Sequence, residues 1–438
     1  MRQTPRPLGG PISTGRFKLL LGAALVGALV LLWRFAAGLG ATTGLNDGYP
    51  WGLWIAFEVV TGTALACGGY AVALLCYVAN KGRYHPLVRP AVLTSALGYT
   101  IAGFAVAIDV GRYWWLYKVF LPWHWNLSSV LLEVALCISA YVVVLWIELS
   151  PAAIERWRAF APARAAGRLL GLPGFARERA PRRAAPAPAP GLPALGVLLQ
   201  DGGVPIERAR AAPGAAAEPH LGGALLFIVA LGLLLPTMHQ SSLGSLMLVA
   251  GTKLHAFWHT PWLPLLFLVS CIAMGYAVVV FESLLSARAF QRTAELPLLR
   301  SLARVMACVQ LGFLALRLLD LGASGKLQAL ALDRHALLLG TELLLFLAPA
   351  LLLLLRRAPA SASRLFVAAV LMLCAGALYR FDVYLIAFDP GPGWTYFPTV
   401  PEILVTLGLL AAEIAIYVAV VRRFPILPAP AALRSSAP

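Results

Sequence analysis

Charged residues are scarce in this chain. They make up 12% of its 438 residues, whereas hydrophobic residues make up 60%. A soluble globular domain exposes much more charge, so the composition excludes that class and indicates an all-α protein that crosses a membrane several times.

Acidic residues are scarcer still, with 19 against 35 basic ones and a formal net charge of +16. An excess of this size could indicate a nucleic-acid partner. The basic residues lie in short connections between apolar runs rather than on one helix face. We therefore expect no nucleic acid, and interpret the bases as topology signals and contacts for anionic lipid head groups.

Sequence motifs for cofactors are also missing. The six cysteines form no CxxC pair, and the chain contains no Walker loop, no GxGxxG followed by an acidic residue and no HExxH. All seven histidines are predicted in loops or at helix ends, so a haem held between two helical histidines is not expected either. The chain is then either a transporter or one subunit of a redox complex whose centres lie elsewhere.

Ten apolar runs are long enough to cross about 30 Å of hydrocarbon. They are 17–38, 52–79, 88–111, 127–149, 221–241, 262–287, 300–320, 336–356, 363–386 and 400–422. Lysine and arginine gather in alternate connections, which predicts that both termini are cytoplasmic and that the number of helices is even. The first run lacks a clear cleavage site and is predicted to remain as a helix.

The stretch 150–219 breaks this pattern because it is rich in Ala, Pro, Gly and Arg. Such a segment buries too little apolar surface to offset its ordering entropy, and we predict a largely disordered cytoplasmic linker. The predicted organisation is a tail (1–16), a front bundle of four helices (17–149), the linker (150–219), a rear bundle of six helices (220–424) and a second tail (425–438).

Polar residues collect at Leu235–Gly251, LPTMHQSSLGSLMLVAG, beside a membrane-length run. One interpretation is an inter-helix turn begun by Pro236. The other is a site, because polar groups at this depth must bond to protein or line a filled cavity. Similar clusters recur at other helix ends on the same predicted side, which favours the site. Two pairs, Asp109/Arg112 and Arg317/Asp320, have the i,i+3 spacing that places both members on one helix face.

Carboxylates inside the predicted spans are costly and often functional. Glu58, Glu133, Glu342 and Glu413 lie within spans, and Glu148 and Glu282 lie toward their cytoplasmic ends. The alternative role for each is a neutral carboxyl bonded to a neighbouring helix. Glu133 is the strongest functional candidate because it follows the His124–Asn126 cluster by about two helical turns.

A family resemblance enters with five segments. They are NDGYPWGLWIAFEV, HPLVRPAVLTSALGY, SSVLLEVALCISAYVVVLWIELSPA, LLPTMHQSSLGSLM and RFDVYLIAFDPGPGWTYFPTVPEIL. Together they resemble the membrane subunit of quinone-linked nickel–iron uptake hydrogenases, within the NrfD/polysulfide-reductase membrane-subunit family. The resemblance runs from about residue 15 to 428, apart from 150–219.

The resemblance implies a ten-helix, haem-free protein of the bacterial cytoplasmic (inner) membrane that binds a quinone, either menaquinone or ubiquinone, as substrate. It implies as partners the nickel–iron hydrogenase large and small subunits and a periplasmic ferredoxin-like iron–sulfur subunit. The chain itself would hold no catalytic metal and no iron–sulfur cluster.

We hypothesise that electrons pass to quinone with coupled proton uptake. The predicted quinone-binding residues are Asn46, Asp47, Tyr49, Trp51, Asp109, Arg112, His239 and Ser241. The predicted proton-relay residues are Glu133, Glu148, Glu282 and Glu58. Two alternatives stay open: the quinone subunit of another complex, built around a molybdopterin or sulfur-compound oxidoreductase, and a proton-linked transporter.

Overall fold

The computed structural model describes residues 5–160, 219–326, 333–355 and 359–428. In these ranges the chain is all-helical, and ten helices are long and apolar enough to cross a membrane. Each coincides with one of the ten predicted runs, which confirms the fold class. The principal helices are α1 (Gly15–Ala37), α2 (Gly62–Leu65), α3 (Gly68–Ala73), α4 (Val88–Asp109), α5 (Val130–Phe160), α8 (Pro219–Leu248), α9 (Leu263–Ala289), α10 (Leu296–Ala323), α11 (Arg334–Leu354), α12 (Ala362–Phe381) and α13 (Val400–Arg423).

The second span is irregular. It begins with a π-helical segment (Trp54–Thr61), continues through α2 and α3, and ends in a second π-helical segment (Leu74–Val78). A third π-helical segment (Asp382–Ile386) extends α12. Wider π turns displace backbone carbonyls from the regular i−4 pattern, and they occur often at functional sites.

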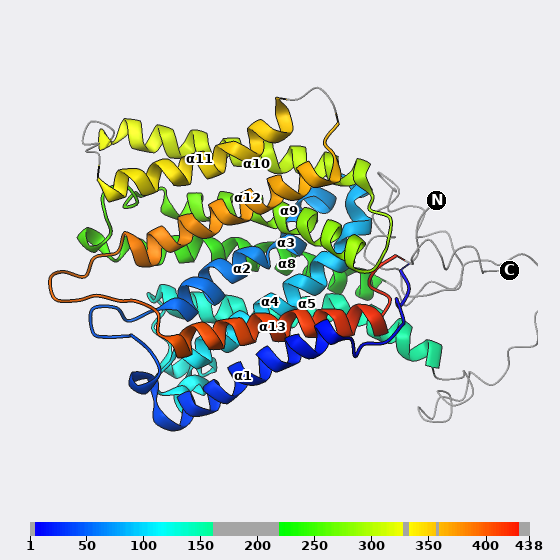
Figure 1. The fold of residues 1–438 in the computed structure, drawn as a ribbon, viewed down its shortest axis with the longest axis horizontal. Coiled ribbons are helices and arrows are strands. Elements are labelled where there is room, and N and C mark those ends of the chain that lie inside the picture. Colours follow the sequence, from blue (N-terminus) through cyan, green and yellow to red (C-terminus); the bar gives the residue numbers. More distant parts are fainter. Residues whose placement is uncertain (1–4, 161–218, 327–332, 356–358, 429–438) are drawn as a thin grey trace, which may run out of the picture.

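The first and last described residues, Pro5 and Pro428, form a β-bridge, so the described N- and C-terminal segments lie at the same end of the molecule (Figure 1). The backbone N–H of Arg6 donates to the carbonyl of Leu427 over 3.0 Å. We call this the terminal end and the opposite side the loop end. The predicted linker (150–219) and C-terminal tail (425–438) lie mostly outside the described residues, although α5 continues eleven residues into the linker range, to Phe160.

Packing joins helices that are distant in the sequence. Helix α5 packs against α4 and α8, and α4 packs against α2 and α3. Helices α10 and α12 pack against both α9 and α11, while α8 and α3 both contact α9. Helix α1 packs chiefly against α13, the last helix, and the two lie side by side along one flank in Figure 1. The predicted front and rear sets are therefore consecutive in the sequence but not separate in space. The contacts between α5 and α8 and between α1 and α13 join them into one bundle.

The contact between α1 and α13 depends on two glycines. A Cβ atom added at Gly408 would lie 2.6 Å from the Cα of Gly27, and one added at Gly27 would lie 2.7 Å from the Cα of Gly408. Small residues let helix backbones approach closely in a membrane, where van der Waals packing is a main driving force for association.

Replacing Gly408 with Ala is expected to lower the free energy of unfolding by about 1–3 kcal/mol, because the two backbones must separate. The matched control is Gly312→Ala in α10, where nothing lies within 4 Å of the new Cβ. That change should be neutral or stabilising, since alanine favours a helix over glycine. Thermal unfolding of the purified protein measures both, and equal midpoints for the two variants would contradict the close packing.

Candidate functional site

The first polar group at the loop end is built around Asn46. Its side-chain oxygen accepts hydrogen bonds from the backbone N–H groups of Gly48 and Tyr49, at 3.1 and 3.0 Å. Its side-chain amide donates to the carbonyl of Thr395 over 2.9 Å. This arrangement is an Asx-type turn, and it fixes the chain before the second span to the loop before α13. The neighbouring Asp47 is exposed.

Tyr49 and Trp51 lie against the segment that follows α12. The Tyr49 hydroxyl donates to the carbonyl of Phe388 over 3.0 Å, and the Trp51 indole N–H donates to the carbonyl of Tyr384 over 2.9 Å. Burial raises the pKa of Tyr49, and the nearby Asp389 raises it further, so the hydroxyl remains a hydrogen-bond donor. The structure therefore brings three predicted residues, Asn46, Tyr49 and Trp51, onto one surface.

Glu402 anchors the same end, and the sequence analysis missed it. Its carboxylate accepts hydrogen bonds from the backbone N–H groups of Gly44 and Thr399, at 3.0 and 2.9 Å, and from the hydroxyl of Tyr396 at 2.6 Å. The signal in the sequence was Thr399-x-x-Glu402 before an apolar run, the pattern of a capping box. Burial and hydrogen bonding to Glu402 raise the pKa of Tyr396.

The predicted pairing of Asp109 with Arg112 is wrong. Helix α4 ends at Asp109 and the chain is extended at Val110, so the two side chains no longer share a helix face. Arg112 is exposed and lies over the ring of Trp115, 4.8 Å from its centroid. The cation beside Asp109 is Arg34, which also donates to the Val110 carbonyl over 2.8 Å.

The second polar group lies deeper and belongs to α8. The helix continues through Pro236 to Leu248, so the alternative of a turn begun by Pro236 is wrong. Proline is tolerated in membrane helices because neighbouring groups satisfy the freed carbonyl. His239 consequently lies inside a membrane span, contrary to the expectation that all histidines fall at helix ends or in loops, and its side chain is 1% exposed.

Thr63 is the hydrogen-bonding centre of this group. Its hydroxyl donates to the carbonyl of Val59 and accepts from the Gln240 amide over 2.9 Å. His239 Nε2 lies 3.1 Å from the same oxygen. Because the hydroxyl hydrogen is already used, His239 must donate from Nε2. Its Nδ1 then carries a lone pair, and this buried atom has no hydrogen-bond partner among the described residues.

Arg380 is the buried cation beside this group. It donates to the carbonyls of Val60 and Phe267 at 3.0 and 3.1 Å, to the Ser270 hydroxyl at 2.9 Å, and to the Gln240 side-chain oxygen at 3.0 Å. Its side chain is 0% exposed, and within the described ranges it forms no ion pair. A buried guanidinium with only neutral acceptors attracts any group on which negative charge develops.

Glu133 reaches the same face of α8. It lies in the first turn of α5 and accepts a hydrogen bond from the Ser242 hydroxyl over 2.7 Å. His239 and Ser242 are three residues apart in α8, so both face the same side of that helix. The hydroxyl of Ser241 bonds instead to carbonyls of its own helix.

Tyr384 connects the two polar groups. Its carbonyl accepts the hydrogen bond of Trp51 at the loop end, and its hydroxyl donates to the carbonyl of Leu243 in α8 over 2.7 Å. Tyr49 and His239 share no hydrogen bond: the Tyr49 hydroxyl is used by Phe388, and His239 is bonded to Thr63. These residues thus form two layers that Tyr384 connects: a loop-end layer with Asn46, Tyr49 and Trp51, and a deeper layer around His239 in α8.

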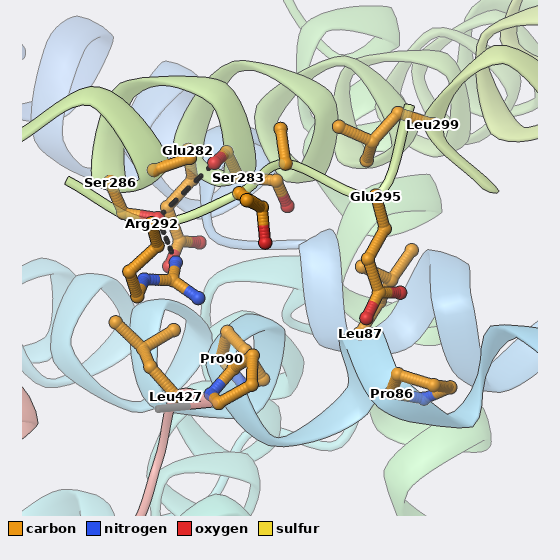
Figure 2. A pocket seen from close by; sticks show the side chains of 14 residues that line it. Pro86, Leu87, Pro90, Glu282, Ser283, Ser286, Arg292, Glu295, Leu299 and Leu427 are labelled. Carbon is orange, nitrogen blue, oxygen red and sulfur yellow. Dashed lines mark hydrogen bonds between the residues drawn. The ribbon is translucent and has the colours of Figure 1, made fainter. Parts of the chain in front are cut away.

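A pocket opens at the terminal end of the bundle, the end opposite the loop-end residues Asn46, Tyr49 and Trp51. Figure 2 shows Glu282, Ser286 and Arg292 on one side of it and Pro90 and Leu427 on the other. The Glu282 carboxylate accepts hydrogen bonds from the hydroxyls of Thr94 and Tyr417, at 2.7 and 2.5 Å. Arg292 donates to Ser286 over 2.9 Å.

Three carboxyl groups lead from this pocket into the bundle. Glu282 is bonded to Thr94 of α4, and the carboxylate of Glu413 in α13 lies beside Gly98, one helical turn further along α4. Glu58 lies near the start of the second span. Glu148 lies apart from this series, because its carboxylate lies against Gly232 of α8. The predicted relay of Glu133, Glu148, Glu282 and Glu58 therefore stays a prediction.

A separate buried cluster holds the rear helices together. Arg317 lies 3.3 Å from the carboxylate of Glu342, and the Trp258 indole donates to the same carboxylate over 2.8 Å. The predicted pair Arg317/Asp320 is confirmed at 3.9 Å, with both side chains largely buried. The partners of Asp320 include the Thr260 hydroxyl at 2.6 Å.

Ten apolar helices that enclose bonded polar clusters define a multi-pass integral membrane protein. The chain is 36% identical over 434 residues to the "Probable Ni/Fe-hydrogenase 2 b-type cytochrome subunit" of Escherichia coli (strain K12), covering 98% of this chain and 96% of that protein. It therefore belongs to the family of Ni/Fe-hydrogenase b-type cytochrome subunits, as the motif resemblance predicted.

Two further relatives come from Nitratidesulfovibrio vulgaris (strain Hildenborough). One protein is 29% identical over 428 residues, covering 93% of this chain and 94% of the relative. The "Menaquinone reductase, integral membrane subunit" is 37% identical over 123 residues, which is 27% of this chain and 28% of that subunit. No family model matches the chain.

The name of the Escherichia coli relative implies a b-type haem, but the histidines described here do not fit one. Among the described residues, His239 lies well inside a span, whereas His85 and His335 lie at span ends; the Nε2 of His239 is bonded to Thr63. His255 and His335 form a close pair, but their rings are stacked face to face with centroids 4.1 Å apart. Axial ligands must point at the iron from opposite faces of the macrocycle, which stacked rings cannot do.

Proposed function

We propose that this chain is the quinone-binding membrane subunit of a respiratory hydrogenase. In this proposal an iron–sulfur subunit, supplied by the nickel–iron large and small subunits, docks at the loop end on the periplasmic side of the bacterial inner membrane. Two electrons and two protons convert the quinone to quinol. The names of the relatives support this, since one is a hydrogenase subunit and another a menaquinone reductase subunit.

The observation that carries the proposal is the buried Arg380 beside His239. Reduction places negative charge on the quinone oxygens, and a guanidinium without a carboxylate partner stabilises that charge in a site of low dielectric. Its neutral partners, Gln240 and Ser270, fix its orientation. The cation therefore need not reorganise when charge develops.

His239 supplies the proton-transfer atom in this proposal. The lone pair of Nδ1 can take a proton from a quinol hydroxyl, or first accept a proton from a donor and then pass it to a quinone oxygen, while Nε2 keeps its contact with Thr63. Such a transfer leaves the hydrogen bonds of the site in place. The loop-end layer, with Asn46, Tyr49 and Trp51, would hold the covering segment 384–396 over the head group.

Two proton sources are available to this site. The nearer is Glu133, bonded to Ser242 on the same face of α8 as His239. The farther is the series Glu282, Glu413 and Glu58, which begins at the terminal-end pocket. Use of the second series would draw protons from the cytoplasm and couple turnover to the membrane potential.

Replacing Glu133 with Gln is expected to reduce hydrogen-driven quinone reduction by about 100-fold, because an amide cannot exchange the proton. Hydrogen oxidation with a soluble dye should be unchanged, since the dye takes electrons upstream. The control is Glu155→Gln on the same helix, whose carboxylate is 48% exposed and paired with Arg89. Unchanged quinone reduction in the Glu133 variant would remove this residue from the mechanism.

The menaquinone reductase relative favours a second candidate, the quinone subunit of a different oxidoreductase complex. Purification of the complex through this chain from native membranes distinguishes the two. Nickel–iron hydrogenase subunits support the first proposal, and a molybdopterin or sulfur-compound enzyme supports the second. Recovery of the chain without any redox partner would favour a proton-linked transporter.

A further inference from the structure

One cluster at the loop end has no role in the function proposed above. His255 lies in the loop between α8 and α9, and Asp333 and His335 lie at the start of α11. One ligand atom from each side chain falls within 4.8 Å of the others. The two imidazole rings are stacked, with centroids 4.1 Å apart and planes 13° apart.

The backbone holds both sides of this cluster in place. The N–H of His255 donates to the carbonyl of Ala387 over 2.9 Å, and Leu254 forms a β-bridge with Phe388. His335 sits in the first turn of α11, a regular helix of 21 residues. The side chains are thus gathered by main-chain structure, and their positions do not depend on contacts between the side chains.

Asp333 has one oxygen free for a ligand. Its Oδ1 caps the helix by accepting from the N–H of Ala336 over 2.8 Å. Its Oδ2 lies 3.5 Å from Nδ1 of His335, farther than a good hydrogen bond. The carboxylate is half exposed, so it can turn toward an ion while the cap remains.

Two imidazoles and one carboxylate are the donor set of zinc sites with an open coordination position. Bonds of 2.0–2.1 Å in a tetrahedron place ligand atoms about 3.3 Å apart. The present spread of up to 4.8 Å therefore has to close by about 1.5 Å, which side-chain rotation in partly exposed residues can supply. The nearby cation Arg334 is exposed, and its Nε is 3.4 Å from His335 Nε2, so it can move aside.

We propose that His255, Asp333 and His335 bind a divalent transition-metal ion of the zinc class at the loop end, with water in the fourth position. Imidazole and carboxylate ligands select this class over calcium or magnesium, which require more oxygen ligands. The ion would reach the site from the compartment that faces the loop end.

The site adjoins the loop-end layer. Any movement of the His255 main chain that metal binding causes beyond side-chain rotation reaches Ala387 through their hydrogen bond, and the neighbouring Phe388 carbonyl holds the hydroxyl of Tyr49. Metal binding should therefore slow quinone reduction. This consequence rests on the proposed function, whereas binding of the ion does not.

Binding is tested with Co²⁺, whose visible absorption reports tetrahedral coordination, on the full-length chain in detergent after removal of any polyhistidine tag. We expect one Co²⁺ per chain, displaced by Zn²⁺ because zinc binds more tightly. His335→Ala and Asp333→Asn should each weaken binding at least about tenfold. Asn keeps the helix cap and removes only the charged ligand, which separates binding from folding.

The matched control is His259→Ala, four residues after His255 in the same loop and outside the cluster. It should bind Co²⁺ like the unaltered chain. Absorption that survives in the His335 and Asp333 variants, or that is lost equally in the His259 variant, overturns the site. In the whole complex, Zn²⁺ should slow quinone reduction at least about tenfold more in the unaltered chain than in His335→Ala. Binding without this difference overturns only the coupling to Tyr49.

Discussion

Replacing Glu342 with Leu is expected to destabilise the protein by about 3–5 kcal/mol, because it leaves the buried Arg317 guanidinium without its closer carboxylate partner. Both side chains of this ion pair are 0% exposed, and they lie 3.3 Å apart. Asp320 cannot take over, since it is 3.9 Å from Arg317 and is engaged by Thr260. The substitution also removes the acceptor of the Trp258 indole.

The matched variant changes both partners, Arg317→Met together with Glu342→Leu. Apolar residues of similar volume often replace a buried ion pair at little cost, so the double variant should recover most of the lost stability. Thermal unfolding of the purified protein in detergent compares the three chains. A double variant no more stable than Glu342→Leu alone would show that the destabilisation comes from packing rather than from an unpaired charge.

Replacing Arg380 with Met is expected to lower quinone reduction by about 100-fold or more, the loss seen when a donor to a developing charge is removed. Dye-linked hydrogen oxidation by the same complex should stay unchanged, because those electrons do not pass through this site. Arg380→Lys keeps the charge but not the planar guanidinium with its five N–H donors. Its quinone activity should therefore lie between that of the unaltered chain and that of the Met variant.

Arg364→Gln is the control for this experiment, since Arg364 lies on the same helix, α12, at its terminal end. The thermal midpoint of each purified complex shows whether the chain still folds. Wild-type quinone reduction in both the Met and the Lys variants would exclude Arg380 from the site. A parallel loss of dye-linked activity would instead indicate that the partner subunits no longer assemble.

Hydropathy made the membrane spans predictable. Each of the ten runs is a helix, because an apolar segment in lipid must satisfy its own backbone hydrogen bonds. The family was predictable as well, because the motif around His239 consists of polar side chains that form specific hydrogen bonds, which makes it distinctive in the sequence. The contact between Glu133 and Ser242 could have been predicted by the same reasoning, because both residues lie near the same predicted face of the membrane.

Bonds between distant parts of the chain were not predictable. Pro236 suggested a turn because proline breaks helices in water, whereas in the bundle α8 continues past it. The Asp109/Arg112 spacing predicted a pair only if the helix continued, and it ends at Asp109. The partners of Arg380 are backbone and neutral side-chain groups from several helices, which no spacing in the sequence identifies.

The pairing of α1 with α13 bears on how the protein is made. Helix α1 is synthesised several hundred residues before α13, yet the surface that receives Gly27 belongs to α13. During translation α1 must therefore remain in the bilayer among lipids or chaperones until α13 has been made. A nonsense mutation ahead of Val400 would leave α1 permanently without its neighbour, and cellular quality control could recognise the defect by that exposed glycine-bearing face.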